Sequence, residues 1–189
     1  AISPNGNIPV HAFNLISPTF FANSSTGNKY SLWVNVYGVS ERYLNVYGEK
    51  DLRAQMNQFF HRTYTHPVDG TTLDMKMLCN WYWYDETAIL ETGKGTKDWN
   101  FYRYAETLLS AAEAIAQSSG VNAEAAGYLA QVKARANMEG KDVSTIASEL
   151  QRLGKQAFIE ECWKERLREF PLEMKIWDDC VRTGKFPQI

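Results

Sequence analysis

The 189-residue chain lacks several features that would place it in a common functional class. No apolar run approaches the ~20 residues that a membrane-spanning helix needs. Only three cysteines are present, Cys79, Cys162 and Cys180, so at least one is unpaired and a scaffold built on disulfides is excluded. Twenty basic and 22 acidic residues give a net charge of -2 without a basic cluster, which argues against a nucleic-acid partner held by phosphate contacts.

Motifs for catalysis and cofactor binding are also missing. The chain has no nucleophile motif, phosphate-binding loop or dinucleotide fingerprint. His11, His61 and His66 lack metal-ligand spacing, so we expect neither a metal nor a cofactor. Glu165 and Glu169 lie one helical turn apart, as a glycosidase pair could, but the Lys and Arg residues between them favour a salt-bridge network between helices. We therefore expect no catalytic residues and no enzymatic activity.

Residues 1–98 form a loop-rich aromatic segment. Its start, AISPNGN, has neither an initiator Met nor a signal-peptide pattern, so we expect a processed chain or a piece of a longer protein. Apolar spacing over residues 51–64 predicts one helix or an irregular helical turn, and a turn at 66–72 follows it. Short extended stretches are predicted at 72–77 and 81–84.

Residues 99–189 are predicted to be helical, beginning with a hairpin of two helices over 99–136. The stripe of the first helix is Phe101, Tyr104, Ala105, Leu108, Ala112, Ile115 and Ala116. The stripe of the second is Ala125, Tyr128, Leu129, Val132 and Ala136, and Asn122 is the expected cap of this helix. Such hairpins stack in tetratricopeptide-like arrays, where each unit covers its neighbour's apolar face.

Three further helices are predicted beyond the hairpin. One opens near Asp142, a longer one runs over 155–170, and Pro171 separates it from a last helix that ends at Thr183 and Gly184. The residues expected to be buried on the last helix are Ile176, Trp177, Cys180 and Val181.

Three ordered blocks in this half resemble the SusD/RagB family of outer-membrane glycan-binding lipoproteins. They are RYAETLLSAAEA at 103–114, YLAQVKARA at 128–136 and ERLREFPLEMKIWDDCVRTG at 165–184. In the last block the matching residues are Glu165, Arg166, Glu169, Glu173, Trp177, Asp179, Arg182, Thr183 and Gly184. Departures from the family pattern are Lys133 for Arg, Phe170 for Leu, Met174 for Gly, Ile176 for Arg and Cys180 for Leu. The resemblance covers roughly the last 140 residues.

The resemblance implies a mostly α fold of tetratricopeptide-like helical hairpins, with long loop insertions and a few short strands. Segments 1–98 and 99–189 would then belong to one larger SusD-like domain. The implied function is non-catalytic glycan binding at the bacterial cell surface, with delivery of oligosaccharides or other nutrients to a SusC-like TonB-dependent transporter. The lipid-anchored N-terminal cysteine would lie in a missing upstream part of the same protein, which is itself an expected partner.

Candidate glycan contacts come from the aromatic loops, because aromatic faces stack on sugar rings. Trp81 and Trp83 share one face of the NWYWY segment, and Tyr30 and Trp33 form a second candidate platform. Burial in the core, or docking of the second platform onto the missing part, remains the alternative for these residues. The family's main sugar-stacking aromatics are expected upstream, so no binding residue is carried over. For the whole chain, the alternative function is a helical-repeat adaptor that binds a peptide or protein partner.

Overall fold

The computed structural model describes residues 40–65, 70–82, 84, 98, 100–171 and 173–185. Contacts divide the chain into two units. We call Ala1–Leu44 with Ala54–Trp99 the hairpin unit, and Asn45–Arg53 with Asn100–Ile189 the helical unit. The prediction that segments 1–98 and 99–189 belong to one larger domain stays a prediction.

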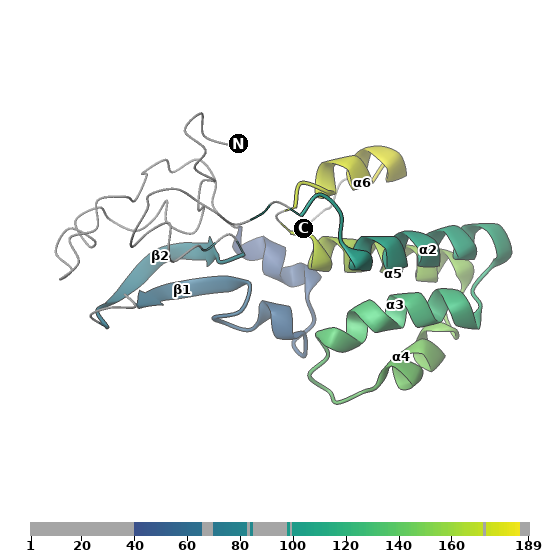
Figure 1. Cartoon of the computed structure of the whole chain (residues 1–189), viewed down its shortest axis with the longest axis horizontal. Coiled ribbons are helices and arrows are strands. Elements are labelled where there is room, and N and C mark those ends of the chain that lie inside the picture. Colours follow the sequence, from purple (N-terminus) through teal and green to yellow (C-terminus); the bar gives the residue numbers. More distant parts are fainter. Residues whose placement is uncertain are drawn as a thin grey trace. The chain divides into compact units, whose positions relative to one another are not determined.

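The hairpin unit contains an antiparallel pair of strands, β1 (Phe60–Thr65) and β2 (Thr72–Asn80) (Figure 1). Phe60 pairs with Asn80 at one end and Thr65 with Thr72 at the other, and the register shifts between His61 and Thr63. Phe60, Tyr64 and Leu78 are buried within this unit. The predicted extended stretch at 72–77 is confirmed and reaches three residues further.

The prediction of a continuous helix over 51–64 is wrong, and only Leu52–Ala54 forms a helical turn. This range contains the short 3-10 helix η3 (Leu52–Ala54), followed by a left-handed residue, Asn57, with φ 64°, and then β1. Phe60 and Tyr64 are both buried and four residues apart. That spacing puts two residues on one face in a helix and also in a strand, so the apolar pattern could not distinguish the two.

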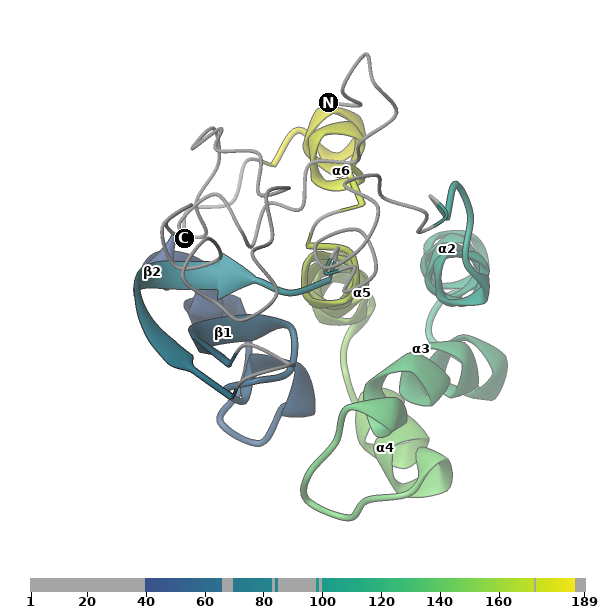
Figure 2. The same cartoon turned by 60° about the vertical axis from the view of Figure 1, so that its left-hand side comes forward.

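The described residues of the helical unit form five α-helices. They are α2 (Tyr104–Ser119), α3 (Ala123–Arg135), α4 (Val143–Leu150), α5 (Lys155–Glu169) and α6 (Ile176–Thr183). Helix α3 packs between α2 and α4, and α5 packs against α2 (Figures 1 and 2). A second 3-10 helix, η2 (Glu41–Val46), spans the boundary between the units. The described residues are therefore mostly helical, as predicted.

Helix ends follow from local hydrogen bonds. The side chain of Asn122 accepts a bond of 2.9 Å from the backbone N–H of Ala125, and Asp142 accepts one of 2.8 Å from Thr145. Both satisfy amides that have no partner within the helix. The predicted hairpin, its Asn122 cap and the start of a helix near Asp142 are confirmed.

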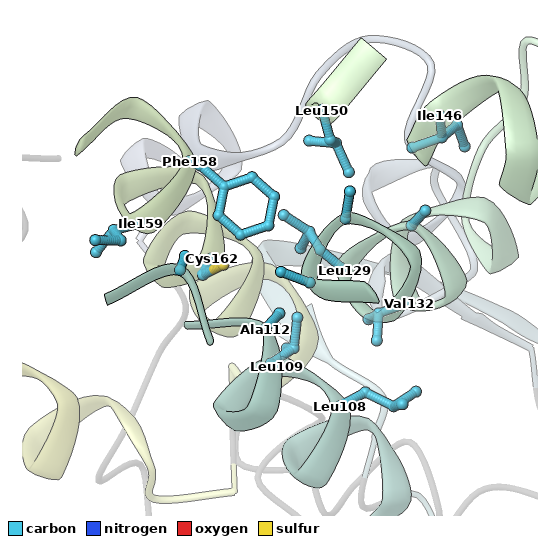
Figure 3. Packing of buried hydrophobic residues seen from close by; sticks show 14 of the residues in the cluster. Leu108, Leu109, Ala112, Leu129, Val132, Ile146, Leu150, Phe158, Ile159 and Cys162 are labelled. Atoms are coloured by element: carbon cyan, nitrogen blue, oxygen red, sulfur yellow. The ribbon is translucent and has the colours of Figure 1, made fainter. Parts of the chain in front are cut away.

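The core of the helical unit lies between α2, α3, α4 and α5, where Leu109, Leu129 and Phe158 are fully buried (Figure 3). Most of the predicted hairpin stripe contributes to it, but Phe101 and Tyr104 are exposed. Leu109 was absent from the predicted stripe. It is buried because α5 covers a second side of α2.

The predicted burial on α6 is correct for Cys180 and wrong for Trp177 and Val181, which are 68% and 59% exposed. Asp179 and Arg182 instead face α5 and α2, where they form ion pairs with Arg166 and Glu113. Among the described residues, no helix combines the length and the apolar content that a membrane crossing requires.

A short segment, residues 45–53, lies against the ends of α3 and α5, and we call it the strap. The N–H of Leu52 donates to the carbonyl of Ala136 at 2.8 Å, and the hydroxyl of Tyr47 donates to the carbonyl of Arg168 at 3.0 Å. These bonds position Arg53, the last residue of the strap, beside α5.

Candidate functional site

The most buried charges of the helical unit are glutamates on and just after α5. Glu165 and Glu169 are 0% and 1% exposed, and Glu173 is 4% exposed. Arg53 Nη1 lies 2.8 Å from Glu165 Oε1 and 3.0 Å from Glu169 Oε2. Arg103 Nη1 lies 2.9 Å from Glu169 Oε1, and its Nη2 lies 2.6 Å from Glu173 Oε1. We call this group the buried ion-pair network.

Arg135, on α3, also contacts Glu169, so this one carboxylate meets guanidinium groups from the strap, the start of α2 and α3. Burial opposes the charge of Arg53, but hydrogen bonding to Asp51 and the nearby Glu165 carboxylate outweigh it and raise the pKa of Arg53. The spacing of Glu165 and Glu169 therefore serves a network that ties helices together. Their oxygen atoms contact basic side chains, as expected for a structural ion-pair network.

Phe170 extends this network towards α6. Its fully buried ring lies under two guanidinium groups, with Arg103 Cζ 4.9 Å and Arg166 Cζ 5.4 Å from the ring centroid. Arg166 in turn pairs with Asp179 of α6 at 2.7 Å. Cations over an aromatic face are attracted to it, so the ring helps to hold both arginines.

Ion pairs attach α6 and the turn before it to α2 and α5. They are Arg166 with Asp179, Arg182 with Glu113 at 2.8 Å, and Lys175 with Glu106 at 3.1 Å. Burial raises the pKa of Glu113, but the two hydrogen bonds from Arg182 and the charge of that guanidinium group more than offset this, so the pKa of Glu113 lies below the ordinary value of 4.5. Glu113 is therefore ionised at neutral pH.

A pocket of about 490 Å³ opens in the helical unit between the strap, the end of α3, α4 and α5. Its lining carries cations and anions that already pair with one another. Lys141 lies 2.9 Å from Glu139 and 3.0 Å from Glu149, and Arg53 lies 2.7 Å from Asp51. These pairs partly neutralise the charges of the lining.

In the hairpin unit, aromatic rings gather at the end of β2. The Trp81 ring stacks on His61, with centroids 4.1 Å apart, and on Tyr84, at 4.9 Å. Tyr64 adds a tilted contact at 5.6 Å. Partial burial lowers the pKa of His61, so its imidazole is neutral at pH 7. A sugar would have to displace a neighbouring ring to stack on the faces of Trp81 that His61 and Tyr84 cover.

The other predicted glycan contacts, Tyr30, Trp33 and Trp83, lie outside the described residues. The glycan-contact prediction for all four aromatics thus stays a prediction. Across the described residues, no three His, Cys, Asp or Glu side chains are grouped as a metal site requires.

One surface feature was missed by sequence reasoning. Phe101, Tyr102 and Trp177 are 77%, 67% and 68% exposed, although the apolar spacing had placed Phe101 and Trp177 in the core. The sequence signal that could have indicated this exposure is the charged side of the last helix. Asp179 and Arg182 lie there at positions that can form ion pairs with neighbouring helices, and this turns the apolar side outward.

Comparisons with known proteins agree with the resemblance. A family model described as the SusD family matches residues 22–188. A crystal structure of a SusD superfamily protein from Parabacteroides distasonis ATCC 8503, at 1.95 Å resolution, is similar with a TM-score of 0.70 and 24% sequence identity. The similarity covers 96% of this chain and 37% of that chain, so the present chain spans little more than a third of that protein. No curated protein matches the chain.

At 24% identity the crystal structure establishes the fold alone. The family model, in contrast, extends over most of the sequence, including all three blocks at 103–114, 128–136 and 165–184. The chain therefore belongs to the SusD family.

Proposed function

We propose that this chain is part of a non-catalytic glycan-binding protein on the outer face of a bacterial outer membrane. The observation that carries the proposal is the match of the SusD family model to residues 22–188. In this proposal the protein delivers oligosaccharides to a SusC-like TonB-dependent transporter. It is held at the membrane by a lipidated cysteine in a part of the protein outside these 189 residues.

The helical unit suits the role of a rigid scaffold. Its core is apolar, and the buried ion-pair network joins the strap, α2, α3 and α5 through Glu165 and Glu169. Charges that are paired and hydrogen-bonded in the interior favour one arrangement of the helices over others. A scaffold of this kind can hold loops at fixed positions for ligand capture.

Aromatic loops are the proposed ligand contacts. Tyr30, Trp33 and Trp83 remain candidates, with Trp81 the weakest of the four because His61 and Tyr84 already stack on its ring. Apolar faces of sugar rings pack on indole and phenol rings, while hydroxyl groups around the sugar hydrogen-bond to nearby polar side chains.

Binding of the intact protein to a panel of polysaccharides tests the proposal. We expect retarded migration in affinity electrophoresis with at least one glycan, confirmed by calorimetry with its oligosaccharides. The bound oligosaccharide should be recovered at its original length after long incubation, because we propose no hydrolysis. Absence of binding to every glycan, together with tight capture of a peptide partner, would instead support the helical-repeat adaptor.

A further inference from the structure

The pocket between the strap, α3, α4 and α5 has a lining that is rich in charges but balanced in sign. Its volume of about 490 Å³ lies within the ~300–1,000 Å³ that is typical of small-molecule sites. Five lining residues are basic and five are acidic: Lys50, Arg53, Lys133, Lys141 and Arg168, and Glu49, Asp51, Glu139, Glu149 and Glu165. The formal charges of the lining therefore sum to zero, and the lining as a whole attracts an ion of neither sign.

Buried ion pairs hold one part of this lining in place. Arg53 and Glu165 are 5% and 0% exposed, and Arg53 Nη1 lies 2.8 Å from Glu165 Oε1. Asp51 accepts two hydrogen bonds from Arg53, at 2.9 Å from Nε and at 2.7 Å from Nη2. A ligand that brings its own charge competes with these pairs, whereas a neutral ligand leaves them intact.

Other groups of the lining keep hydrogen-bonding capacity. Arg168 donates through Nε and Nη1, and within the described residues its Nη2 has no acceptor. The ammonium group of Lys50 likewise forms no hydrogen bond to a described side chain. Glu149 contacts Lys141 at 3.0 Å and 3.2 Å and still has free lone pairs, because a carboxylate can accept about four hydrogen bonds. The lining thus offers both donors and acceptors, which suits hydroxyl groups, since a hydroxyl donates and accepts.

Apolar surface completes the pocket. Ala136 and Ile146 belong to the lining and are 4% and 5% exposed. Small-molecule sites commonly combine apolar lining with a few polar groups that fix the orientation of the ligand. We infer that this pocket is a second saccharide site, which binds one end of a neutral oligosaccharide through its hydroxyl groups. The inference rests on the proposed function and adds a site in the helical unit, separate from the aromatic loops.

Hydrogen exchange of the intact protein with neutral disaccharides tests this site. The probes are cellobiose, lactose, maltose and xylobiose. We expect at least one of them to slow amide exchange in residues 45–53 and 137–149. The protection should be the same at low and high salt, because salt screens only interactions between charges. Absence of protection by all four probes would overturn the inference, as would protection by glucuronic acid or glucosamine alone.

Gly48 allows the pocket to be filled without removing a charge. It lines the pocket, its φ is not positive, and an added Cβ would meet no atom within 4 Å. Gly48→Phe should weaken disaccharide binding by about tenfold or more, because the ring takes up volume that the ligand needs. Gly127→Phe, at a glycine of α3 that is outside the lining and also has no atom within 4 Å of an added Cβ, is the matched control and should bind normally. Equal affinity of the two variants would overturn the inference.

Failure of this site is separable from failure of the proposed function. Retarded migration of the intact protein with a polysaccharide, without protection of residues 45–53 by any disaccharide, would overturn the pocket site and leave the proposed function standing. If neither polysaccharides nor disaccharides bind, both fail. Retained polysaccharide binding in Gly48→Phe, with loss of the disaccharide protection, would support two separate sites.

Discussion

At the scale of single residues, the charged side chains of this protein act mainly on one another. Glu169 is the centre of the buried ion-pair network, since Arg53, Arg103 and Arg135 all contact it. Removing one partner from such a group is costly because the remaining charges stay buried without compensation. The residue's importance therefore comes from its neighbours and not from reactivity.

The first prediction concerns this carboxylate. Glu169→Gln should lower the free energy of unfolding by about 3–5 kcal/mol, because it leaves buried guanidinium groups without their shared counter-charge. Urea denaturation followed by circular dichroism measures the change. Glu160→Gln, on the same helix but bonded only to Gln156 at the surface, is the control and should change stability by less than about 0.5 kcal/mol. Equal stability of the two variants would refute the structural role of the network.

Met174 carries a backbone cost. Its φ of 58° lies in the left-handed region, and it stands where the family pattern has Gly. Since a left-handed residue with a side chain costs about 1–2 kcal/mol, Met174→Gly should raise the free energy of unfolding by about 1 kcal/mol. Met138→Gly, at a position whose φ is not positive, is the matched control and should give no gain. A thermal melt of each variant decides between them.

At the scale of elements, α6 differs from the other helices in how it is attached. Cys180 is its one buried apolar side chain, whereas Asp179 and Arg182 form ion pairs with α5 and α2. Helices α2, α3 and α5 instead share a continuous apolar core. The attachment of α6 should therefore depend on pH more than that of the core helices.

Acid should loosen α6 through Glu113. Its pKa in the folded protein lies below the ordinary 4.5, so its contribution to stability is present above pH 4.5 and is lost as the pH falls through the lower, folded-state pKa. Amide hydrogen-exchange protection factors in α6, which correct for the slower intrinsic exchange in acid, should fall below pH 4.5, before those in α3. In Glu113→Gln this acid-dependent step should be smaller. An α6 exchange profile that is identical in both proteins would show that Glu113 does not hold the helix.

The α2–α3 hairpin depends on apolar contact instead. Leu108 is 6% exposed and belongs to the core. Leu108→Asp should abolish cooperative unfolding at 25 °C, because the carboxylate would be buried without a partner. Thr107→Asp, one position away on the exposed side of α2, should melt normally. Retained cooperative melting of Leu108→Asp would contradict the assigned packing.

At the scale of the whole molecule, scaffold and aromatic ligand contact are assigned to different parts of the chain. The helical unit contains the family's sequence blocks, an apolar core and the buried ion-pair network. Glycan contact is proposed for the aromatic residues of segment 1–98. Stability and affinity should therefore respond to different substitutions.

Substitution of the aromatic candidates tests this separation. Trp33→Ala and Trp83→Ala should each weaken glycan affinity by about tenfold, since loss of an aromatic stacking contact costs about 0.5–1.5 kcal/mol beyond the lost area. Tyr128→Ala, on α3, is the aromatic control and should leave affinity unchanged. Calorimetry on the intact protein measures all three. Unchanged affinity in both tryptophan variants would place the contacts elsewhere.

The helices of the second half could be predicted from local sequence signals. Apolar residues three and four positions apart, the caps at Asn122 and Asp142, and Gly184 after the last helix are local signals, and local hydrogen bonds and periodicity suffice to interpret them. The three family blocks could also be recognised from the sequence, because each is a fixed order of residue types.

The partner of each side chain, in contrast, depends on contacts between residues far apart in the chain. Phe60 and Tyr64 fit a helix or a strand equally well until β2 paired with β1. Trp177 and Val181 have the spacing of core residues. However, Asp179 and Arg182 on the other side of α6 form ion pairs with Arg166 and Glu113, so the charged side of the helix faces α2 and α5 and Trp177 and Val181 are exposed. Periodicity shows that a helix has two unlike sides. Which side is buried depends on charges and apolar surfaces contributed by residues far away in the chain.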